Sequence, residues 1–218
     1  MNIQEQHITF NKQKLILNNQ RTIFWPKQNT LILSDLHLGK AAHFRKNGIP
    51  IPSDVSSLDL QRLASLIDYY RAENILVVGD LIHSGINQEV LLLEEFKKNH
   101  ASLNFHLVIG NHDRQVEKLA KQINIIYHHD KFELEQIHFV HEPAIDRSLF
   151  TISGHIHPGV SIKLPPNKHL RLPCFWVSAQ QIILPAFSKF TGLDSRKMPE
   201  EYDCYALHEE IILQLKNR

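Results

Sequence analysis

The 218-residue chain is predicted to have an α/β fold, a two-sheet β-sandwich with helices outside. Short unbroken apolar runs, such as residues 31–33 and 75–78, end at polar residues, which is typical of buried strands in a sheet covered on both faces. The first half of the chain alternates such strands with amphipathic helices, which indicates right-handed βαβ crossovers. The second half is mostly strands, which favours a second sheet packed on the first.

The elements follow in order along the chain. Three short strands separated by Asn, Lys and Gln turns come first, and the first core strand covers residues 31–34. Residues 39–52 are predicted to be a basic loop that ends at two prolines. Ser53 and Asp54 form a predicted N-cap, and the helix behind it has apolar residues near one face: Leu58, Leu63, Leu66, Ile67 and Tyr70. Further helices are predicted at residues 87–99 and 116–123, a hairpin at 132–134 and 137–140, and other strands at 75–78, 103–109, 125–127, 150–153, 160–163, 172–177 and 182–184.

Composition excludes several classes of protein. Lys and Arg number 24 and Asp and Glu 23, so the net charge of +1 gives no global attraction to nucleic acid or to an acidic membrane. No apolar run is long enough to span a bilayer, and residues 1–10 lack the apolar core of a signal peptide. The two cysteines have no metal-type spacing. We expect a cytoplasmic protein without membrane association, built as one domain over residues 1–218 with a strand-rich part at about 160–218.

Side chains of metal-ligand type follow the ends of five predicted strands. They are Asp35 and His37, Asp80, Asn111 and His112, His141, and His155 and His157. Because α/β sheets usually bind ligands at the ends of their strands, we expect these side chains to meet. A glycine lies beside four of the five groups, and glycine allows the sharp backbone turn that aims a ligand.

The set contains carboxylates, imidazoles and one amide, but no thiolate. Such mixed oxygen and nitrogen ligands suit Mn²⁺, Fe or Zn²⁺ and disfavour a closed structural zinc site. Seven ligands drawn from these eight side chains are too many for one catalytic ion, but they suit two ions that share a bridging carboxylate. The sequence therefore predicts a centre for two divalent metal ions.

The strand ends carry, in order, the motifs Ser-Asp-Leu-His, Gly-Asp-Leu-Ile-His, Gly-Asn-His-Asp, Val-His-Glu and Gly-His-Ile-His. This series resembles the five-motif signature of the calcineurin-like metallophosphoesterases. The resemblance implies an αββα architecture and the hydrolysis of phosphate esters with two divalent ions. Each motif is common by itself, whereas the ordered set is specific.

Three further segments resemble a narrower branch, the bacterial ligase-associated DNA damage response endonucleases. They are residues 39–45 (GKAAHFR), 171–176 (RLPCFW) and 184–192 (LPAFSKFTG). This resemblance implies a Mn²⁺-dependent phosphodiesterase that acts on DNA in repair, in functional association with a DNA ligase and a helicase. Two departures affect the expected substrate contacts: Leu193 stands where a second glycine is expected, and residues 177–181 lack basic side chains.

The family also implies a role for each motif residue. One ion would be bound by Asp35, His37 and His157, the other by Asn111, His141 and His155, with Asp80 as the bridge. A hydroxide held between the ions would attack phosphorus.

His112 would orient the phosphate and protonate the leaving oxygen, and Asp113 would fix the tautomer of His112. His83 matches a histidine that nuclease members place near the phosphate. Substrate contacts are expected at Lys40, Arg45 and Arg171.

Two alternatives stay open at this point. The same chemistry on nucleotides or other small phosphodiesters fits a chain with near-balanced charge and no second domain to grip a duplex. A non-catalytic scaffold with the same fold is the other alternative, although the complete ligand set and His112 argue against it. His83 can equally be a turn residue, and single basic residues are usually solvated. The sequence does not specify the native metal, the cleavage preference or the oligomeric state.

Overall fold

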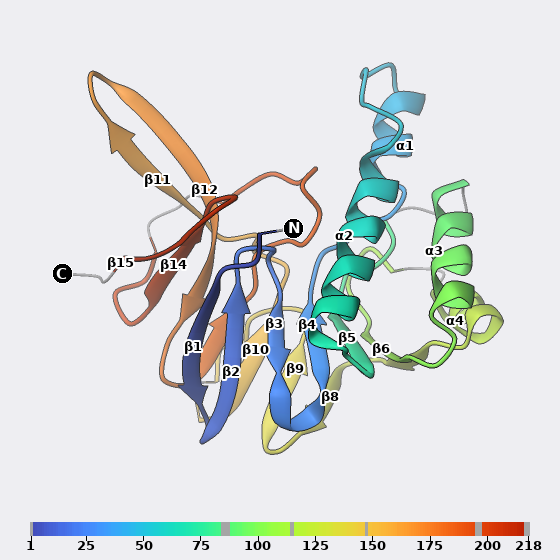
Figure 1. Cartoon of the computed structure of the whole chain (residues 1–218), viewed down its shortest axis with the longest axis horizontal. Coiled ribbons are helices and arrows are strands. Elements are labelled where there is room, and N and C mark those ends of the chain that lie inside the picture. Colours follow the sequence, from blue (N-terminus) through green and yellow to red (C-terminus); the bar gives the residue numbers. More distant parts are fainter. Residues whose placement is uncertain (1, 84–87, 114–115, 147, 195–197, 216–218) are drawn as a thin grey trace.

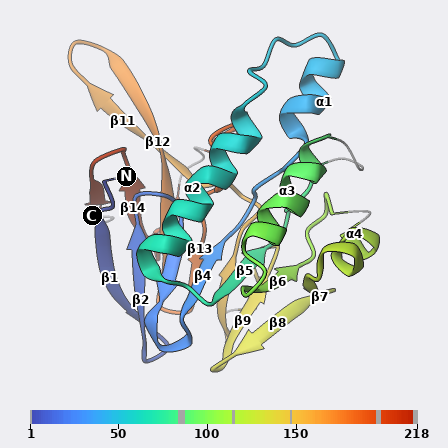
Figure 2. The ribbon, with the colours of Figure 1, turned by 45° about the vertical axis from the view of Figure 1, so that its right-hand side comes forward.

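The computed structural model describes residues 2–83, 88–113, 116–146, 148–194 and 198–215. Within these residues the chain forms two β-sheets packed face to face, with helices against one of them (Figures 1 and 2). The predicted α/β sandwich is confirmed.

A seven-stranded sheet contains the first half of the chain, in the order β1-β2-β3-β4-β5-β6-β7. Strands β1 to β4 pair antiparallel, whereas β4 to β7 are parallel. Helices α2 (Val55–Tyr70), α3 (Gln88–Asn99) and α4 (Val116–Ile123) lie between the parallel strands in sequence, as the βαβ pattern predicted. The strands are β1 Glu5–Phe10, β2 Gln13–Asn18, β3 Ile23–Trp25, β4 Thr30–Leu33, β5 Asn74–Val78, β6 Asn104–Val108 and β7 Ile126–His128, with a short 3₁₀ helix at Pro26–Gln28.

An eight-stranded sheet contains the second half, in the order β15-β14-β12-β13-β10-β9-β8, with β11 paired to β12. Strands β9, β10 and β13 are parallel to one another and the other pairs are antiparallel. The predicted hairpin is present, since Glu135 and Gln136 turn between β8 and β9 with positive φ. The strands are β8 Lys131–Leu134, β9 Ile137–Val140, β10 Phe150–Ser153, β11 Gly159–Leu164, β12 Lys168–Val177, β13 Gln181–Ile183, β14 Asp203–Leu207 and β15 Ile212–Leu215.

The apolar run of β4 is unbroken because both of its faces are covered. Leu31 and Leu33 belong to the apolar cluster under the helices, whereas Ile32 belongs to the cluster between the two sheets. Helices α2, α3 and α4 all lie on the outer face of the seven-stranded sheet (Figure 2). The outer face of the eight-stranded sheet carries a third apolar cluster, which includes Trp176 and Tyr202.

Three local expectations differ from the structure. Residues 40–46, expected within a loop, form helix α1 (Lys40–Lys46), which starts after Gly39 in a left-handed conformation. Strands β14 and β15 were not predicted individually. Leu58 is 54% exposed, and Leu60 is buried in its place because it points toward the sheet. Asn87, expected to open α3, lies outside the described residues.

Two projections rise from the same side of the molecule (Figure 1). One is α1 with the segment that follows it, and the other is the hairpin of β11 and β12. None of the helices in the described part of the chain is both long and apolar enough to cross a membrane.

Candidate metal centre

Loops at the carboxyl ends of five strands carry the predicted ligands. Asp35 and His37 follow β4, Asp80 follows β5, Asn111 follows β6, His141 follows β9, and His155 and His157 follow β10. Strands β4 to β6 belong to the first sheet and β9 and β10 to the second. The structure therefore brings all seven side chains to one place, where the ends of the two sheets meet.

Asp35, His37 and His157 form the first cluster of ligand atoms. Asp35 Oδ1 is 3.1 Å from His157 Nε2 and 3.9 Å from His37 Nε2, and the two imidazole nitrogens are 3.2 Å apart. These atoms are close enough to one another to hold a single ion.

Asn111, His141 and His155 form the second cluster. His141 Nε2 is 2.9 Å from Asn111 Oδ1 and 3.1 Å from His155 Nδ1. On its other side, His141 Nδ1 is 3.4 Å from the carbonyl oxygen of Val78. A proton on Nδ1 directed at that carbonyl leaves the lone pair of Nε2 for a metal, which is the usual way a ligand histidine is oriented.

Asp80 lies between the two clusters. Its Oδ2 is 3.5 Å from His141 Nε2 and 3.9 Å from His37 Nε2. Its other oxygen, Oδ1, accepts a hydrogen bond of 2.9 Å from the backbone N–H of His112. One oxygen of Asp80 thus faces both clusters, as a bridging carboxylate does in a dinuclear site.

The donor set fits two divalent cations. The buried Asp35 Oδ1 has no hydrogen bond of suitable geometry among the described residues, although His157 Nε2 is near, and an unsatisfied buried acceptor is costly. Burial lowers the pKa of His37 to about 2, although Asp35 opposes this, so the imidazole is neutral with a free lone pair. Burial raises the pKa of Asp35, but the neighbouring imidazoles outweigh it and leave the pKa lowered, so the carboxyl is ionised. Ionised carboxylates and neutral imidazoles are the forms that bind metals.

Five of the seven candidate ligands have a strained backbone conformation. Asp35, His37, Asp80, His155 and His157 all have φ between +50° and +68°. A positive φ is uncommon for residues other than glycine and costs roughly 1–2 kcal/mol. Strain of this kind persists where the surrounding structure fixes the backbone, and it clusters at functional sites.

At two positions beside the ligands, the neighbouring atoms leave no space for any residue other than glycine. A Cβ atom on Gly79, which has a φ of +83°, would lie 1.9 Å from His141 Nδ1. A Cβ atom on Gly110 would lie 2.3 Å from both the backbone nitrogen and Oδ1 of Asp80. The predicted sharp turn thus applies to Gly79, whereas Gly110 allows the bridging residue to approach closely.

The loop after β13 supports the Asp35 loop. The N–H of Phe187 donates to the carbonyl of Ser34 at 2.8 Å, and the N–H of Ser188 donates to the carbonyl of Asp35 at 3.3 Å. The N–H of His155 also donates to Asp35 Oδ2, at 3.1 Å. The resemblance of residues 184–192 to a family segment pointed to this loop, but not to its role in holding Asp35.

His112 lies at the open edge of the centre. Its side chain is 42% exposed, and its Nε2 is 4.0 Å from Asp80 Oδ2. The His83 ring packs on it, with 4.6 Å between ring centroids, and burial lowers the pKa of His83 to about 4. Asp113 does not fix the tautomer of His112 as expected. Its two oxygens instead accept hydrogen bonds from the N–H of Gly110 in its own turn and from the N–H of Ile82 in the loop after β5.

The three predicted substrate contacts belong to α1 and to β12. Lys40 is the first residue of α1, and burial lowers its pKa while Asp35 and Asp80 oppose the shift, so its ammonium group is near both carboxylates. Arg45 donates to the carbonyl of Pro52 at 2.9 Å, and Arg171 of β12 donates to that of Leu193 at 3.0 Å. Arg45 and Arg171 thus belong to the two separate projections.

Comparison with known proteins agrees with this geometry. The model of the calcineurin-like phosphoesterase family matches residues 29–207, which include every candidate ligand. The chain belongs to the calcineurin-like phosphoesterase family. It is a metal-dependent hydrolase of phosphate esters, as the sequence motifs predicted.

Solved structures provide a second comparison. The nuclease MPE of Pseudomonas putida is 28% identical to this chain, with a TM-score of 0.82 over 97% of this chain and 100% of that chain. Yfce, a phosphoesterase from E. coli, is 15% identical, with a TM-score of 0.45 over 87% of this chain and 99% of that chain. No curated protein matches the chain.

Proposed function

We propose that this phosphoesterase hydrolyses phosphodiester bonds in DNA at a dinuclear metal centre. The observation that carries the proposal is the position of Asp80 Oδ2 between the two ligand clusters. Two ions that shared this carboxylate would suit a phosphodiester, whose attacking and leaving oxygens both need stabilisation. Similarity to a nuclease over the length of both chains supports nucleic acid as the substrate.

Seven side chains are proposed as the metal ligands. One ion would be held by Asp35, His37 and His157, the other by Asn111, His141 and His155, and both by Asp80. We infer Mn²⁺ as the native ion, since carboxylate and amide oxygens together with imidazoles suit it, although Fe and Zn²⁺ share these preferences. When bound, the two ions supply an activated water as nucleophile and neutralise charge on the phosphate oxygens.

His112 is the proposed general acid. As the bond between phosphorus and the leaving oxygen breaks, the protonated imidazole gives its proton to that oxygen. Its exposed side chain can reach a substrate that sits over Asp80, and its backbone N–H holds Asp80 in place. His83 packs against the ring of His112 and orients it beside the phosphate.

Substrate contacts are proposed at Lys40, Arg45 and Arg171. The chain is nearly neutral as a whole, so DNA must be held by local charges rather than by a global field. Lys40 is near the carboxylates of the centre, and the two arginines belong to the projections on either side. We further propose a single-domain cytoplasmic enzyme of DNA repair that works with a DNA ligase and a helicase, as resemblance to the narrower branch suggests.

A substrate panel tests the proposal. The wild-type chain and the Asp80→Asn variant are incubated with Mn²⁺ and plasmid DNA, single-stranded oligonucleotides, cyclic nucleotides or bis-nitrophenyl phosphate. We expect the wild type to cleave DNA and the nitrophenyl ester, and the variant to cleave neither. Turnover of cyclic nucleotides with intact DNA would instead assign the enzyme to small phosphodiesters. Full metal loading without turnover of any ester would indicate a scaffold.

A further inference from the structure

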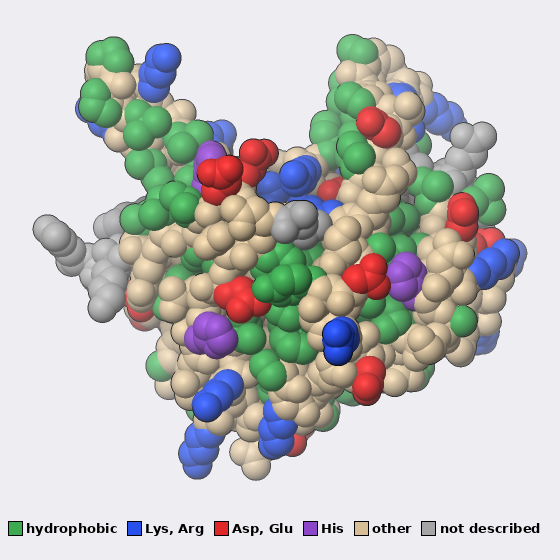
Figure 3. Space-filling view, in the orientation of Figure 1, with side chains coloured by type: hydrophobic (Ala, Val, Ile, Leu, Met, Phe, Trp, Pro, Cys, Tyr) green, Lys and Arg blue, Asp and Glu red, His purple; other side chains and the backbone are tan. Residues whose placement is uncertain are grey.

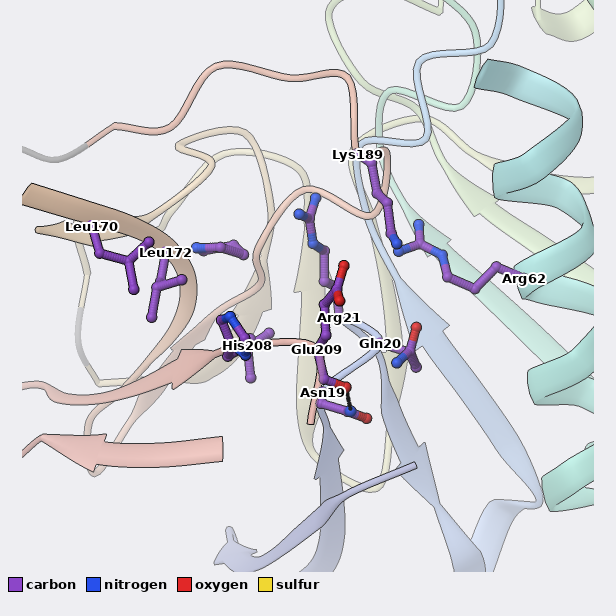
Figure 4. Close-up of a pocket in the computed structure, with 11 residues that line it drawn as sticks. Asn19, Gln20, Arg21, Arg62, Leu170, Leu172, Lys189, His208 and Glu209 are labelled. Atoms are coloured by element: carbon purple, nitrogen blue, oxygen red, sulfur yellow. Dashed lines mark hydrogen bonds between the residues drawn. The ribbon is translucent and has the colours of Figure 1, made fainter. Parts of the chain in front are cut away.

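A hollow of about 460 Å³ lies between the β11–β12 hairpin and α2. Basic side chains gather there between the two projections of the molecule (Figure 3). Arg21, Arg62 and Lys189 line one side and Leu170 and Leu172 of the hairpin line the other (Figure 4). None of these residues is a candidate metal ligand.

The two arginines bind the back of the segment that supports Asp35. Arg21 Nη1 donates to the carbonyl of Ser188 at 2.7 Å, and Arg62 Nη2 donates to the carbonyl of Phe187. The N–H groups of these same two residues hold the Ser34–Asp35 loop. The hollow and the candidate metal centre are therefore separated by one extended segment of chain.

Positive charge in the hollow is only partly compensated. Arg62 is 7% exposed and pairs with Asp59 at 2.8 Å, and Asp59 also influences Arg21, so two guanidinium groups share one buried carboxylate. Burial lowers the pKa of both arginines, which reflects the cost of keeping these charges away from water. Lys189 adds a third cation, and Glu209 is the other acidic residue at the rim.

The exposed Lys189 side chain presents its hydrogen-bond donors to the hollow, whereas Arg62 Nε is shielded from it. Arg62 Nε is buried without a partner among the described residues. The Lys189 ammonium group likewise makes no hydrogen bond or ion pair within the part of the chain that the structure describes, although its backbone N–H is 3.4 Å from Asp59 Oδ1. An anion bound in the hollow would accept hydrogen bonds from the Lys189 ammonium group, while the shielded Arg62 contributes positive charge nearby.

We propose that this hollow binds a backbone phosphate of the DNA strand whose neighbouring bond is cut at the metal centre. This inference rests on the proposed function. Guanidinium and ammonium groups are the usual partners of phosphate. The wall of Leu170 and Leu172 offers apolar contact to a sugar or base, which an isolated inorganic anion would not use. Residues 186–188 lie between the hollow and the loop that carries Asp35, so the two sites are neighbours.

Lys189 is the residue whose replacement tests phosphate binding without disturbing the structure of the metal centre. Arg21 and Arg62 also hold the segment next to Asp35, so their replacement would disturb the metal centre. The Lys189 side chain is exposed and its ammonium group holds nothing in place, so Lys189→Ala tests the phosphate contact alone. Lys14, exposed near the start of β2 and at the opposite end of that strand from the hollow, provides the matched control.

The experiment measures KM for a fluorescent single-stranded oligonucleotide with the Mn²⁺-loaded enzyme over a series of salt concentrations. For a single strand, one phosphate contact contributes about 0.7 to the magnitude of the slope of log affinity against log salt concentration. That contact therefore makes the affinity about fivefold higher at 0.1 M salt than at 1 M salt. We expect Lys189→Ala to raise KM about fivefold at 0.1 M and to reduce the slope by about 0.7. Lys189→Arg should restore both values, and Lys14→Ala should change neither.

The outcomes separate this inference from the proposed function. If DNA is cleaved and Lys189→Ala behaves like Lys14→Ala, the hollow is not a phosphate site and the DNA assignment stands. If KM for bis-nitrophenyl phosphate rises as much as KM for DNA, Lys189 acts through the metal centre and the inference is overturned. If the wild type hydrolyses the small ester but neither cleaves nor binds DNA, the assignment of DNA as substrate fails and this inference fails with it.

Discussion

Substitution of Gly79 should distinguish the effect of crowding a metal ligand from the effect of backbone strain at the substituted position. A Cβ atom on Gly79 would lie 1.9 Å from His141 Nδ1, and an ordinary van der Waals contact begins at 3.4 Å. The imidazole must therefore move by about 1.5 Å, the difference between these distances. Metal–ligand distances tolerate only about 0.2 Å, so the shifted Nε2 of His141 cannot complete the second ligand cluster.

Gly48 is the matched control. Its φ of +80° nearly equals the +83° of Gly79, but a Cβ atom there would meet nothing within 4 Å. Both alanine variants thus carry the same left-handed backbone cost, roughly 1–2 kcal/mol at each position. Any difference in metal binding between them comes from the displaced histidine.

The assay is calorimetric titration of the metal-free chains with Mn²⁺, together with thermal unfolding. Gly48→Ala should keep both binding events at wild-type affinity. Gly79→Ala should lose about 10- to 100-fold in affinity for at least one ion, the range found when the groups around a metal ligand are disturbed. Two binding events of wild-type affinity in Gly79→Ala would refute the assignment of His141 as a ligand.

Four further outcomes follow from the same geometry. Asp80→Asn should weaken both metal sites and abolish turnover, because Oδ2 faces both clusters; metal analysis with normal stoichiometry and full activity would contradict this. His112→Ala should keep both ions and lose about 10²–10⁴-fold on DNA but far less on a nitrophenyl diester, whose leaving group needs no proton; equal losses would mean that His112 only positions the phosphate. Arg45→Glu should raise KM for DNA and flatten its salt dependence while sparing the small ester, and an unchanged slope in the salt series would exclude this contact. Asp59→Ala should cost about 3–5 kcal/mol in denaturant unfolding, because the buried Arg62 loses its partner; a change below 1 kcal/mol would contradict that pairing.

The sequence predicts the strands that carry the metal ligands more accurately than it predicts the elements at the borders of the site. Strands such as β4 are covered on both faces, so their apolar runs and the ligands after them stand out without a structure. Helix α1 is short and strongly basic, and the prolines beyond it favoured a loop over the helix that forms. Strands β14 and β15 have less regular patterns, and pairing with β12 rather than local preference defines them.

Several contacts within the site join residues that are far apart in the sequence, so a local sequence pattern does not predict them. The bond between Phe187 and Ser34 joins residues more than a hundred positions apart, so no local pattern contains it. The family resemblance implied that Asp113 fixes the tautomer of His112, yet its carboxylate accepts hydrogen bonds from the amides of Ile82 and Gly110. Arg21 and Arg62 are single basic residues in the sequence, and only the fold places both against one short segment.

That segment explains how a strained ligand loop can persist. Asp35 has a positive φ and a fully buried carboxylate, both unfavourable by themselves. The amides of Phe187 and Ser188 fix its backbone, and the guanidinium groups of Arg21 and Arg62 fix that segment from behind. Cations thus support the loop on one side, while the metal ion that Asp35 would bind with His37 and His157 would neutralise its carboxylate on the other. A phosphate in the hollow would offset the charge of Arg21 and Arg62. These arginines also hold the segment that fixes the Asp35 loop, so binding of substrate in the hollow would be coupled to the geometry of the metal ligands.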